Sequence, residues 1–215
     1  MQRAPDIGAR IPDDREDRDL IVEHWTDYVE TIVGGLRAMV VTDGLGAAVS
    51  ARDGVDRWVA MTRALHDRGG QLYIIGNGGS AGMASHMAAD ACKNGHLRAL
   101  AFNDPALVTA TANDLSYDQV FSLPLERLAR AGDLLVAISS SGNSPNIVRA
   151  LEATRGLAVE AVTLSAMRPD NRSRRMGVLN FYVPLDRYGW AESAHQVILH
   201  YWFDQYLNLH RHGAL

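Results

Sequence analysis

Apolar residues recur with a helical period at the start of this chain and come in short continuous runs after it. In two stretches, residues 20–39 and 55–65, apolar side chains return every three or four positions, which predicts two amphipathic helices. The glycines Gly69 and Gly70 end the second helix. Short apolar runs then predict strands at residues 72–76, 98–102, 133–138, 159–164 and 179–183.

Helical patterns fill the intervals between these strands. They predict helices near residues 80–94, 105–113, 118–130, 145–155, 170–176 and 190–208. Nearly continuous apolar strands that alternate with helices indicate a parallel sheet buried on both faces. We therefore predict a three-layer α/β fold, with a doubly wound, five-stranded parallel sheet preceded by two N-terminal helices. Ligands of such a sheet bind at the carboxyl ends of the strands, where the strand order reverses.

Length and charge limit the classes of function. The chain has 215 residues, which suits one domain at residues 20–210 after a mobile, charged segment at residues 1–19. A formal net charge of −4 argues against broad binding of nucleic acid, and no apolar run approaches the ~20 residues of a membrane span. The N-terminal residues lack the apolar centre of a signal peptide, and Cys92 is the only cysteine. These features predict a cytoplasmic protein that binds neither nucleic acid nor membranes.

Two polar loops follow strands of the predicted sheet. Residues 76–80, with the sequence GNGGS, follow the first strand, and residues 139–144, with the sequence SSSGNS, follow the third. Glycines let the backbone approach a ligand closely, a helix N-terminus offers free N–H groups to an anion, and serine hydroxyls add donors. Two such loops predict one phosphorylated metabolite bound between them.

Each loop also has another interpretation. Gly76, Gly78 and Ala81 fit the G-x-G-x-x-A pattern of dinucleotide-binding proteins, with Asp104 in the place of the ribose-binding acid. The polar Asn77 and the second serine loop favour a sugar phosphate, but a dinucleotide site and plain tight turns remain alternatives. In the second loop, a single serine would be enough to cap the following helix, which leaves the other hydroxyls unexplained.

Two of the predicted helices carry side chains suited to proton transfer or metal binding. His86 and Asp90 are four residues apart on one face of a helix, and Glu192 and His200 lie just over two turns apart on the last helix. Together these four side chains would suit a divalent ion such as zinc. The alternatives are an ordinary hydrogen bond within the first pair and a polar stripe that faces solvent or another subunit in the second.

Three ordered segments resemble the sugar isomerase (SIS) domain: GNGGSAGMASHMAAD, ATANDLSYDQVF and AGDLLVAISSSGNSPNIVRAL. They are similar in particular to the phosphoheptose isomerase branch, and the resemblance covers residues 20–207. It implies a flavodoxin-like sheet, a homotetramer with active sites between subunits, and interconversion of sedoheptulose 7-phosphate and D-glycero-D-manno-heptose 7-phosphate.

The resemblance also implies roles for individual residues. Family members can bind zinc, one ion per subunit, through the positions of His86, Asp90, Glu192 and His200. The substrate-binding positions of the family are both loops, an Asn-Asp pair and a residue of the last helix. In this chain they are Asn77, Gly78, Gly79, Ser80, Asn113, Asp114, Ser139, Ser140, Ser141, Ser144 and Glu192.

The chain departs from the family pattern near the expected site. Asp90 stands where the family has a catalytic glutamate, and Glu192 stands where it has a glutamine, so two carboxylates accompany two imidazoles. Residues 93–96 and 167–170 replace family loops that border the substrate. Because Asp90 has a shorter reach than glutamate, a phosphosugar other than the heptose remains an alternative.

The leading hypothesis is an aldose–ketose isomerase of a phosphorylated sugar, with sedoheptulose 7-phosphate as the expected substrate. Isomerisation moves a proton between adjacent carbons through an enediol and needs a base and an acid. We predict Asp90 as the base and His200 as the acid.

Two other classes compete with an enzyme. The related DnaA initiator-associating protein acts by protein contact in replication initiation, but it lacks the carboxylate and the histidine found here at Asp90 and His200. A sugar-phosphate-sensing regulator would carry a helix-turn-helix module. The first predicted helix is instead apolar along one face, as is typical of helices that pack between subunits. We predict a homotetramer with this apolar stripe at its centre, formed by Val22, Trp25, Val29, Ile32 and Leu36.

Overall fold

The computed structural model describes the backbone of residues 15–212 and the side chains of residues 24–209. Residues 1–14 of the predicted N-terminal segment lie outside this range, as does the side chain of Val22, while residues 15–19 begin the first helix. The helices are α1 Arg15–Arg37, α2 Ala51–Asp67, α3 Gly79–Lys93, α4 Pro105–Asp114, α5 Ser122–Leu128, α6 Pro145–Leu157 and α7 Tyr188–His212. Two short 3₁₀ turns are η1 Tyr117–Gln119 and η2 Ser173–Arg175.

The strands form one seven-stranded sheet in the order β2-β1-β7-β6-β5-β3-β4. Their bounds are β1 Val40–Asp43, β2 Ala48–Val49, β3 Gln71–Gly76, β4 Arg98–Ala101, β5 Leu134–Ser139, β6 Glu160–Ser165 and β7 Leu179–Tyr182. The five strands from β3 to β7 are parallel, as predicted, and the strand order reverses between β3 and β5. The loops after these two strands therefore lie at the switch point, where ligands of doubly wound sheets bind.

The prediction of a five-stranded sheet was incomplete, because an antiparallel hairpin extends it. β1 pairs with β7 and with the two-residue strand β2. Gly46, at φ +84°, forms the hairpin turn, and the Asp43 carboxylate accepts hydrogen bonds from the backbone N–H groups of Leu45 and Ala47, each at 2.9 Å. Both strands are too short to carry a periodic pattern, so the sequence predicts no strand between the first two helices.

Two predicted helices differ in the structure. The helix predicted at residues 118–130 is divided into η1 and α5, because Pro124 lacks an N–H group and fits only the first turn of α5. The helix predicted at residues 170–176 is reduced to η2. There the Asn171 side chain accepts a hydrogen bond from the backbone N–H of Arg174 at 3.1 Å, and such a contact competes with helical pairing.

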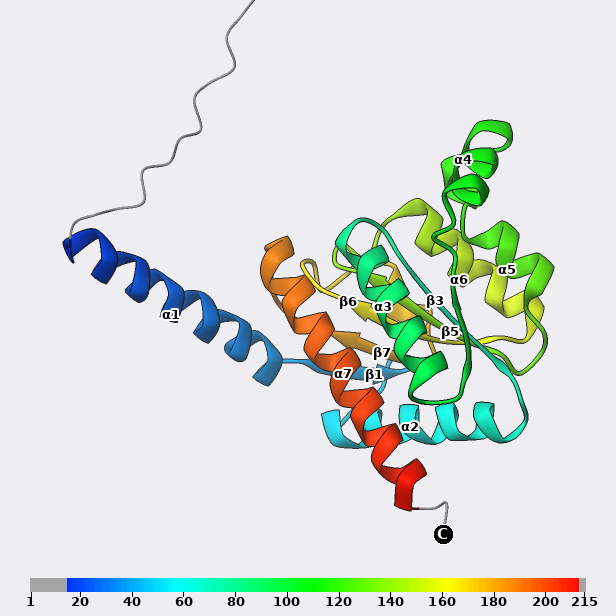
Figure 1. The fold of residues 1–215 in the computed structure, drawn as a ribbon, viewed down its shortest axis with the longest axis horizontal. Coiled ribbons are helices and arrows are strands. Elements are labelled where there is room, and N and C mark those ends of the chain that lie inside the picture. Colours follow the sequence, from blue (N-terminus) through cyan, green and yellow to red (C-terminus); the bar gives the residue numbers. More distant parts are fainter. Residues whose placement is uncertain (1–14, 213–215) are drawn as a thin grey trace, which may run out of the picture.

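Helices cover both faces of the sheet (Figure 1). Alternate residues of β3 point to opposite faces: Leu72 and Ile74 pack with α2, α3 and α7, while Tyr73 and Ile75 pack with α5 and α6. On the first face, two buried tryptophans from α2 and α7, Trp58 and Trp202, stack with ring centroids 4.3 Å apart. This packing fixes α7 against the sheet and so sets the position of the polar side chains that α7 carries.

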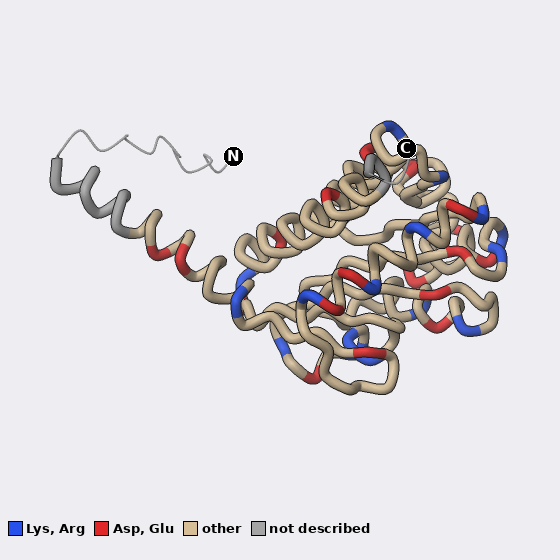
Figure 2. Tube along the Cα trace, turned by 90° about the horizontal axis from the view of Figure 1, so that it is seen from below, with Lys and Arg blue, Asp and Glu red and all other residues tan. Residues whose placement is uncertain are grey.

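Helix α1 projects from the body of the protein (Figure 1). Its C-terminal part is packed: a Cβ on Gly35 would lie 2.5 Å from Cγ of Leu185, and Ile32 and Leu36 lie against the core. Farther out, Trp25 is 63% exposed. Positively and negatively charged residues are interspersed along the chain in the body of the protein (Figure 2). Within the described part of the chain, no helix has the length and apolar content needed to cross a membrane.

Candidate active site

The glycine-rich loop joins β3 to α3 in a conformation that needs glycine at two positions. Gly78 has φ +55°, which side chains disfavour. A Cβ on Gly76 would lie 2.6 Å from the carbonyl oxygen of Ser80, so any side chain there would displace the first turn of α3. The loop thereby brings the free N–H groups at the start of α3 to the carboxyl end of the sheet.

The serine loop joins β5 to α6. Gly142, at φ +63°, approaches Asn171 so closely that a Cβ would lie 2.0 Å from its Oδ1 atom. Ser139 Oγ accepts a hydrogen bond from the backbone N–H of Gly142 at 3.2 Å. Ser144 occupies the N-cap position of α6, but its hydroxyl makes no capping hydrogen bond. Helix capping therefore does not account for this serine, and its hydroxyl is free to donate to a ligand.

The remaining serines of this loop differ in exposure. Ser141 Oγ accepts a hydrogen bond from the backbone N–H of Asn143 at 3.3 Å. The hydroxyl oxygen of Ser140 is buried and has no hydrogen-bond partner among the described residues. The loop thus presents its hydroxyls unequally, with those of Ser141 and Ser144 the more accessible.

An amide pair links the glycine-rich loop to the first turn of α6, directly after the serine loop. Asn77 Nδ2 donates to Asn146 Oδ1 at 2.9 Å, and Asn146 Nδ2 donates back to Asn77 Oδ1 at 2.8 Å. Asn146 is only 1% exposed, and Tyr117 adds a hydrogen bond from its hydroxyl to Asn77 Oδ1 at 3.3 Å. We call this reciprocal pair the amide clasp. It fixes the separation of the two loops, so Asn77 acts in the site by holding the loops as well as by lining the cavity.

Between the loops lies a cavity of about 240 Å³. It is lined by the two loops and the start of α7, namely Asn77, Gly78, Gly79, Ser80, Ile138, Ser139, Ser140, Ser141, Ser144, Tyr188 and Glu192. Two helix N-termini and several hydroxyls surround it, a combination that suits a phosphate group. The predicted loop residues are therefore together in one cavity.

Glu192 lies where this cavity meets a second one. A Cβ on Gly79 would lie 2.5 Å from Glu192 Oε2, so the carboxylate covers the N-terminus of α3, where the helix dipole favours negative charge. Both residues also line a groove of about 710 Å³ along α7, together with His200. A ligand held in the loop cavity would therefore extend past Glu192 toward His200.

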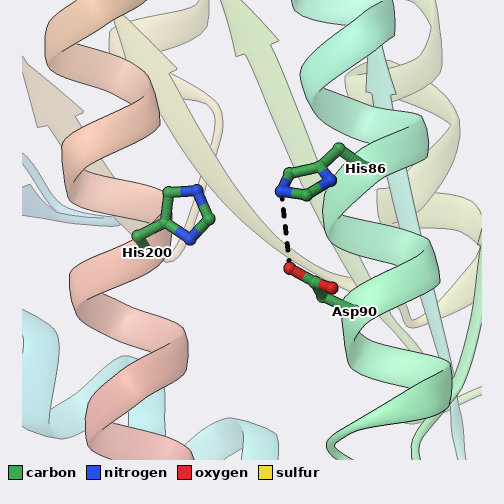
Figure 3. A group of neighbouring side chains, drawn as sticks. All are labelled: His86, Asp90 and His200. Carbon is green, nitrogen blue, oxygen red and sulfur yellow. Dashed lines mark ion pairs between the residues drawn. The ribbon is translucent and has the colours of Figure 1, made fainter.

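Three of the four predicted metal-binding side chains come together beside this groove (Figure 3). His86 and Asp90 project from α3 and His200 from α7, and one ligand atom from each lies within 4.8 Å of the others. His86 Nε2 is 3.4 Å from Asp90 Oδ2, while Asn94 Nδ2 donates to the other carboxylate oxygen at 3.2 Å. Glu192 is not part of this group. Two imidazoles and a carboxylate are a donor set that zinc accepts, with a further position left for water or substrate.

The predicted Asn-Asp pair lies apart from this site. Asn113 and Asp114 end α4, which extends away from the sheet (Figure 1). Asn113 Nδ2 donates to Asp114 Oδ1 at 2.8 Å, and neither residue lines the two cavities. Substrate binding by Asn113 and Asp114 stays a prediction. Within one chain, the described part of the structure places this pair away from both loops.

Known proteins share this sequence and fold. The SIS domain family matches residues 47–165. A phosphoheptose isomerase of Mycobacterium tuberculosis is 37% identical over 186 residues, which cover 80% of this chain and 87% of that protein. A phosphoheptose isomerase of Desulfovibrio desulfuricans is 48% identical over 98 residues, so the chain matches about half of that relative, 47% of its length. The phosphoheptose isomerase GmhA of Neisseria gonorrhoeae superposes with a TM-score of 0.75 at 25% identity, over 88% of this chain and 97% of that one.

The chain belongs to the SIS domain family, in its phosphoheptose isomerase branch. The resemblance inferred from the three sequence segments is thereby confirmed, and so is the doubly wound α/β class of the fold.

The departures of this chain from its family have structural counterparts. In the segment at residues 93–96, Asn94 orients Asp90. Residues 172 and 173, just after the departing segment at residues 167–170, support the serine loop: the backbone N–H of Ser173 donates to the Gly142 carbonyl at 2.9 Å, and that of Arg172 donates to Asn143 Oδ1 at 3.0 Å. Neither departing segment lines the two cavities.

The sequence pattern did not identify Asn94 and Asn146 as residues that support the site. Asn146 follows Pro145 in the first turn of α6, a place that suggests only helix initiation, and its partner Asn77 is 69 positions away. Asn94 follows the last residue of α3 and looks like a helix terminus. Its spacing of four residues from Asp90 is the signal that could have identified it.

A buried histidine of α7 makes stability sensitive to acid. His195 is 0% exposed, lies near the Ser165 backbone, and has no hydrogen-bond partner of regular geometry among the described residues. Burial lowers the pKa of His195 from 6.5 to about 4. The unfolded chain therefore takes up a proton at a higher pH than the folded protein does, and stability falls as the pH drops from 6.5 toward 4.

We expect this histidine to lower the free energy of unfolding by about 2 kcal/mol between pH 7 and pH 5, relative to a variant without it. Urea denaturation at both pH values measures the effect in the parent, in His195→Leu and in His24→Leu, which alters an exposed histidine. His195→Leu should lose this part of the pH dependence, and His24→Leu should keep it. Equal pH dependence in the parent and His195→Leu would contradict the assignment.

Proposed function

We propose that this protein is an aldose–ketose isomerase that interconverts sedoheptulose 7-phosphate and D-glycero-D-manno-heptose 7-phosphate. The observation that carries the proposal is the continuity of the loop cavity, which suits a phosphate, with a groove that leads to His200 and the adjacent Asp90. A linear sugar phosphate needs this separation between its anion and its reacting carbons. The names of the aligned relatives support the same activity.

The phosphate would lie at the serine end of the cavity. There the N-terminus of α6 and the hydroxyls of Ser141 and Ser144 offer donors. The Glu192 carboxylate repels an anion at the opposite end, next to Gly79, but it accepts hydrogen bonds from sugar hydroxyls. Glu192 therefore orients the substrate with its phosphate inward and its carbon chain in the groove.

Asp90 would take the proton from one carbon of the substrate, and His200 would donate a proton to the adjacent carbon of the resulting enediol. Asp90 has one oxygen held by Asn94 and the other turned toward His86, so its orientation is set before substrate binds. His200 faces this pair from the opposite helix (Figure 3). An acid and a base on opposite walls of a groove can transfer a proton across a planar enediol.

His86, Asp90 and His200 would hold a divalent cation such as zinc, and Glu192 would approach it only through a change of side-chain conformation. When bound, such a cation supplies Lewis acidity to a carbonyl oxygen of the substrate. Its ligation would compete with the role of Asp90 as base, since both use the same carboxylate. We retain the cytoplasmic location expected from the sequence for an enzyme with this substrate.

The proposal is tested by mixing the purified protein with sedoheptulose 7-phosphate and following aldose formation by NMR. Formation of the heptose aldose supports the assignment. Activity on another ketose phosphate alone would keep the isomerase mechanism and replace the substrate. No turnover of any phosphorylated ketose would favour the non-enzymatic class.

Removing two hydroxyls of the serine loop should weaken substrate binding. In Ser141→Ala/Ser144→Ala we expect KM to rise ~10-fold or more, because each lost donor costs about 1–3 kcal/mol, while the fold is kept. Steady-state kinetics measures KM, and Ser50→Ala is the control. Ser50 caps α2 and accepts a hydrogen bond from Asp53 N at 3.0 Å, so its loss should lower stability without raising KM. An unchanged KM in the double variant would place the phosphate elsewhere.

We further propose a homotetramer that packs through α1 and α7. Trp25 on α1 and Val197 and Tyr201 on α7 are 63%, 50% and 53% exposed, an unusual density of large apolar side chains on a surface. Light scattering at micromolar concentration should give four times the chain mass, and Trp25→Asp should reduce it. Leu45→Asp, at the 96% exposed tip of the β1–β2 hairpin, should leave the mass unchanged. A monomeric parent protein would contradict this assembly.

A further inference from the structure

A second polar cavity lies at the opposite end of the sheet from the candidate active site. Its volume is about 400 Å³. The residues around it come from the end of α2, the starts of β3 and β4 and the segment between α5 and β5: Arg68, Gly69, Gly70, Gln71, Tyr73, Arg98, Leu100, Leu128, Arg130, Ala131 and Asp133. The six residues of β3 separate its two ends by about 20 Å, so this cavity is distinct from the loop cavity.

Three arginines make this cavity positive. Arg68 donates from Nε to the Gly132 carbonyl at 3.1 Å, and Arg98 donates from Nη1 to the Gly69 carbonyl at 3.0 Å. These contacts use only part of each guanidinium. The side chain of Arg130 makes no hydrogen bond or ion pair with the described residues. Donors on all three therefore remain for a ligand.

A single carboxylate opposes these charges, and the backbone already satisfies it. Asp133 is 5% exposed. Its Oδ1 accepts a hydrogen bond from the backbone N–H of Gln71 at 2.8 Å, and its Oδ2 accepts one from that of Arg130 at 2.8 Å. Three positive charges against one negative leave a net positive cavity in a protein whose net charge is −4. An anion is the ligand that this charge favours.

Tyr73 supplies a hydroxyl donor to the cavity, which it lines. The residue as a whole is 2% exposed, and its hydroxyl makes no hydrogen bond to the described residues. Burial, with a smaller contribution from Asp133, raises the pKa of Tyr73 to about 12 against the opposing effect of Arg98 and Arg130. The hydroxyl is therefore protonated at neutral pH. The Tyr73 hydroxyl opens onto the cavity, so it can donate a hydrogen bond to a ligand oxygen there.

The walls add an apolar surface. Leu100 is 47% exposed on the edge strand β4, and Leu128 is 52% exposed at the end of α5. Leu100 pairs in register with Tyr73, so their side chains lie on the same face of the sheet. The volume exceeds what an inorganic phosphate needs, and these leucines offer contact to a planar or apolar group beside the arginines.

We propose that this cavity binds an organic phosphate with an apolar portion, of the nucleoside diphosphate type. The phosphates contact Arg68, Arg98 and Arg130, the Tyr73 hydroxyl donates to a phosphate oxygen, and the base covers Leu100 and Leu128. Arginine suits this role because its planar fork pairs with phosphate oxygens in a bidentate manner.

Isothermal titration of the full chain with ADP and GDP tests the proposal, with pyrophosphate and adenosine as partial ligands. We expect one nucleoside diphosphate per chain, bound more tightly than either partial ligand. Arg130→Ala should weaken binding roughly 10- to 100-fold, and Tyr73→Phe should weaken it roughly 10-fold. Arg127→Ala, which removes an exposed arginine of α5 outside the cavity, should change nothing.

Further measurements separate this site from the active site. Ser141→Ala/Ser144→Ala should bind the nucleotide as the parent does, and Arg130→Ala should keep the parent's turnover of sugar phosphate. Absence of nucleotide binding at millimolar concentration, or binding that Arg130→Ala leaves unchanged, would overturn the proposal. Loss of binding in the serine variant would assign the nucleotide to the active site, and equal affinity for pyrophosphate would overturn the contribution of the apolar walls.

Discussion

Replacing Asp90 with Asn is expected to lower turnover ~10²-fold or more, because the substitution keeps the shape of the side chain and removes the base. Asn94 can still bond to the new amide oxygen, so the geometry of α3 should persist. Steady-state kinetics on sedoheptulose 7-phosphate measures the loss. Asp56→Asn is the matched control, since Asp56 lies on α2 in an exposed pair with Arg52 and does not line the groove.

Asp90→Glu tests the reach of this base. If the substrate is the heptose, the longer side chain should preserve or raise turnover. If Asp90→Glu abolishes activity on another phosphosugar and gains none on the heptose, the substrate assignment is wrong although the isomerase mechanism stands. An Asp90→Asn variant with full activity would contradict the assignment of the base itself.

Replacing His200 with Ala is expected to remove both bound zinc and nearly all turnover, since an acid and a ligand disappear together. Elemental analysis measures the metal, with one ion per subunit expected in the parent protein. His86→Ala separates the two roles, because it removes a ligand and leaves the proposed acid in place. It should lower metal content, and any turnover that survives in it but is lost in His200→Ala belongs to the acid.

Two results would contradict this mechanism. A parent protein free of metal, together with full activity of His200→Ala, would exclude both roles of the histidine. Full metal content in both histidine variants would move the metal site away from the group in Figure 3. Circular dichroism of each variant verifies that the fold is kept, as expected for side chains that are not fully buried.

The parallel part of the fold could be predicted from the sequence because its physical cause is local. A strand buried on both faces must be apolar at nearly every position, and β3, β5 and β6 are buried almost throughout. The β1–β2 hairpin lacks this signature. It is held by antiparallel pairing of β1 with β7, which lies more than a hundred positions away in the chain.

The candidate active site could likewise be predicted only in part from the sequence. Both loops follow strands that are plain in the sequence, so their meeting at the switch point could be predicted. The position of Glu192 depends on how α7 is rotated by the stacking of Trp58 on Trp202, and no spacing within α7 reveals it. The direction of α4, which carries Asn113 and Asp114 away from the loops, is likewise set by tertiary packing.

The amide clasp has a consequence for any attempt to redesign this protein. Each of its two asparagines satisfies the other, so changing one alone strands a buried amide, and only a paired replacement could preserve the arrangement. Substitutions that alter substrate preference therefore disturb the structure least on α7, where Glu192 and the other groove residues can change without affecting the loops. The two loops therefore have to be treated as one structural unit when the site is redesigned.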